Sequence, residues 1–130
     1  MNRKKYTYAA VAALGLLMAV TVLLAACGGS STEGPNQVHM SDARFVQEVV
    51  TIPKGAMLTL VNDAPVIHII KNGTWDQSGT PRPAKEQGAP AVDVSVTANG
   101  SQQIGPFNTA GTFQLYCVPH PGMKLSVVVH

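Results

Sequence analysis

The sequence predicts an all-β domain, either a sandwich or a barrel. Short segments of alternating or β-branched apolar residues recur roughly every ten residues, and Gly and Pro punctuate the intervals between them. Beyond the N-terminal apolar run, no segment has a convincing helical pattern. The predicted strands cover residues 49–52, 56–62, 66–71, 92–98, 112–117 and 124–129.

The first three predicted strands follow from local patterns. Residues 49–52 lead into Pro53-Lys54-Gly55, a turn built on Pro and Gly. Residues 56–62 alternate apolar and polar side chains, as expected of a strand with one buried face. Residues 66–71 form a β-branched run that a single histidine, His68, interrupts.

The later strands have equally simple signals. Residues 92–98 alternate strictly and end at the Asn99-Gly100 turn, and residues 112–117 alternate again before the closing strand 124–129. Residues 72–90 are polar and rich in Gly and Pro, so we expect an irregular loop there. Loops of this length are often functional.

The N-terminus has the pattern of an export signal. Three basic residues precede an apolar run over residues 6–26, and Leu24-Ala25-Ala26-Cys27 resembles the lipobox of bacterial lipoproteins. In that family the cysteine is diacylated and becomes the mature N-terminus. We therefore expect a signal peptide at 1–26, a lipidated Cys27 with a flexible linker at 27–37, and a folded domain at 38–130.

An uncleaved transmembrane anchor is the alternative for this segment, since an apolar run of 21 residues is long enough to cross a bilayer. Either interpretation places the domain outside the cytoplasmic membrane and tethers it there. We expect an extracytoplasmic, membrane-anchored protein at the cell surface or in the periplasm.

The charge of the mature part excludes one class of partner. Three of the nine Lys and Arg residues lie before Cys27, which leaves six against seven Asp and Glu and a net charge of −1. There is no basic patch and no aromatic ladder, so nothing supports nucleic-acid binding.

The chain has two cysteines, and the lipid would consume Cys27. Exported proteins normally pair their cysteines, so a lone Cys117 is either a buried, inert side chain or a functional one. His120 and Met123 follow within six residues, in a loop stiffened by Pro119 and Pro121. Thiolate, imidazole and thioether form a soft donor set that suits copper, and His68 is the one histidine inside a predicted core strand.

Residues 117–123, CVPHPGM, have the spacing C-x-x-H-x-x-M and resemble the ligand loop of the cupredoxins, in particular the short-loop amicyanins and pseudoazurins. The stretches VTIPKGAMLTLVNDAPVIH and GPFNTAGTFQLYC resemble the cupredoxin segments that lead to the other ligands. The similarity spans residues 38–130. It implies a Greek-key β-sandwich with one type 1 copper ion bound by His68, Cys117, His120 and Met123.

The resemblance also implies a function. By resemblance to the cupredoxin electron carriers, the protein would shuttle single electrons between redox partners and would not be an enzyme. The partners would be respiratory or photosynthetic complexes or cytochromes. By analogy with the family, an apolar docking face should surround His120, and we expect the protein to be monomeric. The predicted docking residues are Pro65, Val66, Val118, Pro119 and Pro121.

Two departures from the family pattern stand out. Ile69 occupies the position where many cupredoxins carry an Asn that ties the ligand loops together, and Lys124 stands where a Gly is common. In addition, Pro119 has no N–H to offer Cys117. We expect this to keep the sulfur electron-rich and the reduction potential low.

Other functions remain open at this stage. Each of the four side chains taken alone is more often structural, and an extracytoplasmic copper chaperone or storage protein is the main alternative. Nucleophilic catalysis by Cys117 with His120 lacks a nearby orienting carboxylate. We expect His39 and His130 to be surface residues and Trp75 to be a loop anchor.

Overall fold

A computed structural model describes residues 34–130, which form ten strands in two sheets. The predicted signal peptide and Cys27 lie outside the described residues. Residues 34–130 contain no helix, and therefore none that could span a membrane. The strands are β1 (Gln37–Ser41), β2 (Arg44–Phe45), β3 (Val49–Ile52), β4 (Leu58–Asn62), β5 (His68–Trp75), β6 (Pro81–Pro83), β7 (Asp93–Val96), β8 (Ser101–Ile104), β9 (Gly111–Cys117) and β10 (Lys124–Val129).

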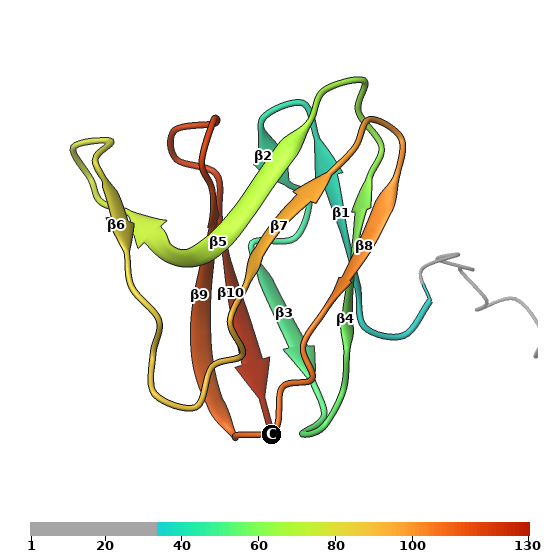
Figure 1. Cartoon of the computed structure of the whole chain (residues 1–130), viewed down its shortest axis with the longest axis vertical. Helices are drawn as coiled ribbons and strands as arrows, with labels where there is room; N and C mark the ends of the chain where they lie inside the picture. The colour runs from blue at the N-terminus through green and yellow to red at the C-terminus, as the bar shows by residue number, and fades with distance from the viewer. Residues whose placement is uncertain (1–33) are drawn as a thin grey trace, which may run out of the picture. The chain divides into compact units, whose positions relative to one another are not determined.

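The chain crosses repeatedly between the two sheets (Figure 1). One sheet has the order β2-β1-β4-β8, and the other has the order β3-β10-β9-β5-β6, with β7 also paired to β5. The β1–β4 and β3–β10 pairs are parallel, whereas the remaining pairs are antiparallel. Parallel neighbours so distant in sequence require crossover connections, as Greek-key sandwiches have.

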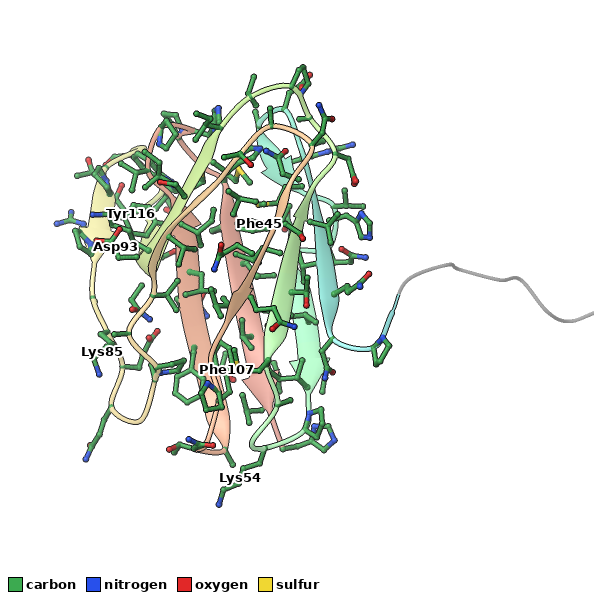
Figure 2. The ribbon with its side chains drawn as sticks, turned by 45° about the vertical axis from the view of Figure 1, so that its right-hand side comes forward. Phe45, Lys54, Lys85, Asp93, Phe107 and Tyr116 are labelled. Carbon is green, nitrogen blue, oxygen red and sulfur yellow. The ribbon has the colours of Figure 1, made fainter. Side chains whose placement is uncertain are left out.

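The core lies between the inner faces of the sheets. The burial of β4 and β10 alternates residue by residue, which is what the period-two sequence pattern predicts for strands with one face on the core. Figure 2 shows Phe45 toward one end of the core and Phe107 toward the other, and both are essentially fully buried. Burying a phenylalanine side chain contributes about 1.5–3 kcal/mol, so both ends of the core add to the stability of the fold.

The all-β prediction is confirmed, and β3 and β10 have the predicted bounds. The prediction of one irregular loop over 72–90 is wrong in part. Strand β5 continues to Trp75, and residues 81–83 return beside it as β6. Gly73, at φ +127°, allows the bend that makes this hairpin possible. In the sequence alone, the same glycine suggests that the strand ends there.

Three loops lie at the same end of the sandwich. The β4–β5, β7–β8 and β9–β10 connections all turn at the upper end in Figure 1, opposite the C-terminus. The predicted metal ligands belong to two of these connections or to the strands beside them. The topology thus brings together residues 49 or more positions apart in sequence.

Candidate metal centre

The β9–β10 connection holds three of the predicted ligands. Cys117 is the last residue of β9, and Met123 immediately precedes β10. The Cys117 N–H donates to the Met123 carbonyl at 3.0 Å, and the Met123 N–H donates to the His120 carbonyl at 3.1 Å. These two bonds close a tight loop, in which Gly122 adopts φ +82°.

The fourth predicted ligand comes from the neighbouring strand. His68 opens β5, which pairs with β9 in the register Ile70 to Cys117. The Val118 N–H continues this ladder by donating to the Ile69 carbonyl at 2.8 Å. The strand pairing itself therefore carries the His68 side chain to the start of the ligand loop.

The donor atoms converge on one point. The Cys117 Sγ lies 3.5 Å from His68 Nδ1 and 3.3 Å from His120 Nδ1. The ligand atoms of these three residues all lie within 4.8 Å of one another. Around a first-row ion at ordinary metal–nitrogen and metal–sulfur distances, such donors would be roughly 3.3–3.8 Å apart. The two sulfur–nitrogen distances, 3.5 and 3.3 Å, lie in this range, so the sulfur and the two rings fit a single ion.

The thiol of Cys117 is completely buried, and burial raises its pKa. The backbone N–H groups of Ile69 and His120 oppose this by favouring the thiolate. In the metal-free chain the thiol is therefore protonated at neutral pH, and a metal ion that binds the sulfur must displace the proton.

The imidazole of His68 is also completely buried. Its pKa is lowered, first by burial and then by the charge of His120, against the opposing influence of the Ser41 carbonyl and Asp42. Its Nε2 atom is buried without a hydrogen-bond partner among residues 34–130. A neutral ring with Nδ1 toward the sulfur is the form that binds a metal.

Met123 is buried and is joined to Cys117 and His120 by its backbone bonds, and of the four predicted ligands only His120 is partly exposed. The rings of His68 and His120 lie 4.8 Å apart, centroid to centroid, at an interplanar angle of 56°. One thiolate and two imidazoles beside a thioether form a soft, mixed donor set. That set suits copper, and a hard cation such as calcium or magnesium would prefer oxygen ligands.

The sequence analysis missed a residue that organises this end of the molecule. Asn62, the last residue of β4, is buried and donates to the carbonyls of Val66 at 2.7 Å and Thr97 at 2.9 Å. Its Oδ1 accepts from the Ala64 N–H at 3.0 Å. A buried amide with this many backbone bonds fixes the β4–β5 loop against the β7–β8 loop.

The predicted docking residues lie at the surface or near it. Pro65, Val118, Pro119 and Pro121 are exposed, while Val66 is half-buried. Ile67, which the sequence analysis did not include, is 55% exposed and immediately precedes the ligand histidine His68. Its exposed side chain adds apolar surface beside the predicted docking residues.

The chain resembles known copper proteins over most of its length. Residues 32–130 match the family described as copper binding proteins, plastocyanin/azurin family. A plastocyanin of Scenedesmus fuscus is 33% identical over 87 residues, which cover 65% of this chain and 85% of that protein. A plastocyanin of Ulva prolifera is 28% identical over the same shares of the two chains.

Solved structures share the fold. A purple cupredoxin from Nitrosopumilus maritimus superposes with a TM-score of 0.55 at 19% identity, covering 72% of this chain and 98% of that one. Amicyanin from Paracoccus versutus superposes with a TM-score of 0.55 at 23% identity, covering 74% of this chain and 81% of the amicyanin chain. The predicted cupredoxin resemblance is confirmed: the chain belongs to the plastocyanin/azurin family of copper-binding proteins, and copper is its cofactor.

Proposed function

We propose that the protein is a type 1 copper electron carrier whose ion is bound by His68, Cys117, His120 and Met123. The observation that carries the proposal is the completely buried Cys117 sulfur, placed between the Nδ1 atoms of two histidines. Copper supplies a one-electron couple, Cu(I)/Cu(II), when bound. The protein residues set the geometry and the polarity around it.

Four protein ligands favour electron transfer over catalysis. Catalytic metal sites keep a coordination position open for water or substrate, whereas this donor set fills the positions from the protein. His68, Cys117 and Met123 are buried, so neither water nor a substrate has direct access from their side. This is why we infer a carrier and not an enzyme.

The loop is built to hold its ligands in place. Backbone bonds join Cys117 to Met123 and Met123 to His120, and the two prolines restrict the intervening backbone. A ligand set that moves little between oxidation states lowers the reorganisation that accompanies electron transfer. The rigidity of the β-sandwich around the buried thiol contributes to the same effect.

His120 is the electron port in this proposal, because it is the one histidine ligand with part of its side chain at the surface. Exposed apolar residues of both adjacent connections accompany it. They are Pro65, Ile67, Val118, Pro119 and Pro121. Transient redox complexes use small interfaces, for which an apolar face of this kind is sufficient.

We place the protein on the outer side of a membrane, held by a lipid on Cys27 after removal of residues 1–26. The support is the lipobox-like sequence and the polar residues 28–36 that follow it. A tethered carrier would exchange electrons with membrane-bound redox complexes or cytochromes. A copper chaperone or store is less consistent with the site, because such proteins need an accessible metal and Cys117 is buried.

Electron self-exchange between Cu(I) and Cu(II) forms, measured by NMR line broadening, tests the docking face. Val118→Lys should slow self-exchange about tenfold or more, because two copies meeting through this face would repel. Met57→Lys is the matched control, since Met57 has the same 38% exposure and follows the Pro53-Lys54-Gly55 turn, at the other end in Figure 2. Equal rates in the two variants would contradict the proposed port.

A further inference from the structure

Trp75 is the only tryptophan of the chain and the last residue of β5. It is buried, and its indole N–H donates a 3.1 Å hydrogen bond to the backbone carbonyl of Cys117. The ring also meets Tyr116 edge-on, with centroids 5.8 Å apart at 89°. The expected loop anchor therefore contacts the backbone of the thiol ligand itself.

The bend of β5 is what brings the indole to this place. Residues 70–72 pair with β9, but residues 73–75 leave that strand and pair with β6. Figure 1 shows β5 curving away from β9 toward β6. Gly73, at φ +127°, allows the change of direction, and a Cβ there would collide with the Arg82 carbonyl. The curve returns Trp75 to the level of Cys117.

The far end of the hairpin is fixed as well. The Asp76 carboxylate accepts hydrogen bonds from the Ser78 hydroxyl at 2.6 Å, from the Thr80 backbone N–H, from the Arg82 side chain and from the Ser78 backbone N–H. These bonds hold the pKa of Asp76 well below its usual range. Trp75 thus stands between a closed turn and a paired strand, so its indole has little freedom to leave the Cys117 carbonyl.

We propose that Trp75 is a positioning residue for the thiol ligand, acting through the Cys117 carbonyl. That carbonyl begins the peptide link to Val118, where β9 ends and the ligand loop starts. The indole donor fixes the orientation of this peptide and offsets the partial negative charge of its oxygen. The bulk of the ring also keeps water from the backbone behind the sulfur. This inference rests on Cys117 being the copper ligand.

Loss of the indole hydrogen bond should change the reduction potential of the copper site in one direction. Without the indole donor, the carbonyl oxygen has more negative charge, and water can approach it. Both changes stabilise the more highly charged Cu(II) form. Loss of the indole N–H should therefore lower the reduction potential, which a purely structural role of Trp75 would not require.

The first test needs no substitution. Since the chain has one tryptophan, the single indole N–H resonance of the full-length, metal-free protein belongs to Trp75. Hydrogen exchange of that proton should be slowed at least a hundredfold relative to a free indole. Exchange at the rate of an exposed indole would overturn the proposal, whether or not any variant folds.

The second test compares Trp75→Phe with Phe113→Leu in the copper-loaded full-length protein. Phe113 is buried on the same strand as Cys117, so its truncation costs stability without touching the carbonyl. We expect both variants to melt at lower temperature, but Trp75→Phe alone to lower the potential and shift the charge-transfer band. An unchanged potential and band in Trp75→Phe would overturn the positioning role. If unmutated protein lacks the band, the copper-ligand assignment itself fails.

Discussion

The side-chain amide of Asn62 donates a 2.7 Å hydrogen bond to the backbone carbonyl of Val66, and so ties the end of β4 to the loop that leads into His68. The same amide reaches the Thr97 carbonyl in the β7–β8 loop at 2.9 Å. One buried side chain therefore joins two of the connections at the copper end. Ile69 stands where many cupredoxins carry an Asn that ties the two ligand loops, and here the Val118 N–H joins those segments by donating to the Ile69 carbonyl at 2.8 Å.

Asn62→Ala should lower the free energy of unfolding of the metal-free protein by about 2–3 kcal/mol, because it leaves buried backbone groups without partners. Urea denaturation measures this loss. Exposed Asn108 provides the control, and its alanine variant should change stability by less than about 0.5 kcal/mol. Similar losses in the two variants would contradict the role assigned to Asn62.

Two glycines of the β5–β6 hairpin make a matched pair. Gly73→Ala should lower the free energy of unfolding by at least about 2 kcal/mol. Its φ of +127° is strained for alanine, and the new Cβ would collide with the Arg82 carbonyl. Gly79 also has a positive φ, +75°, but a Cβ there has open space, so Gly79→Ala should cost only about 1 kcal/mol. Thermal unfolding of both variants checks the order, and the reverse order would refute it.

The lowered pKa of His68 makes the stability of the metal-free protein depend on pH. Burial, followed by the charge of His120, holds this pKa below its ordinary value of 6.5. The unfolded chain therefore takes up a proton below pH 6.5 that the folded metal-free chain resists, and stability falls as the pH drops. His68→Gln should show a smaller loss of stability between pH 7 and pH 5. An identical slope in both proteins would count against the buried neutral ring.

At alkaline pH the stability of the metal-free protein should change in the opposite direction. Burial raises the pKa of Cys117 above its ordinary value of 9.0, so above that pH the unfolded chain releases a proton that the folded metal-free chain retains. Stability should therefore fall as the pH rises beyond 9.0. Cys117→Ala should lack this contribution in urea denaturation at pH 8 and pH 10. A variant that follows the unmutated protein would show that the thiol is not buried as described.

Pro119→Ala tests how the loop tunes the sulfur. Two backbone N–H groups, those of Ile69 and His120, already act on the Cys117 thiol. Alanine would offer another N–H at a position where proline has none, and the added donor should raise the reduction potential by about 60 mV, equivalent to ~1.4 kcal/mol. Protein-film voltammetry measures the shift. No rise, with the visible band retained, would show that this peptide does not face the sulfur.

The side chains that converge at the site could be predicted from the sequence because their signals are local or chemical. The spacing of Cys117, His120 and Met123 lies within one loop, and His68 is conspicuous as a polar residue in a β-branched run. Their meeting is a consequence of the β5–β9 register, which the structure supplies. Side chains that can bind a metal are rare in such a small core, and for this reason the four predicted ligands could be recognised.

The strands that the sequence did not predict have weak patterns. Strand β1 pairs in parallel with β4, and its hairpin with the two-residue strand β2 turns at Asp42-Ala43, which lacks the glycine of a strong hairpin signal. Strand β8 has three exposed residues out of four. Strand β6 has the sequence Pro81-Arg82-Pro83, a composition that disfavours strands and is tolerated at a sheet edge. The role of Asn62 was hidden for a related reason: its partners lie on loops up to 35 positions away, and only tertiary structure brings them together.

The central claim is that Cys117 is a thiolate ligand of copper. It is tested most directly by the visible spectrum of the full-length protein after addition of Cu(II), beside Cys117→Ser. The account predicts an intense blue or green band that ascorbate bleaches and that the serine variant lacks. A colourless protein, or a weak band that survives the substitution, would contradict the account and leave a β-sandwich whose metal chemistry lies elsewhere.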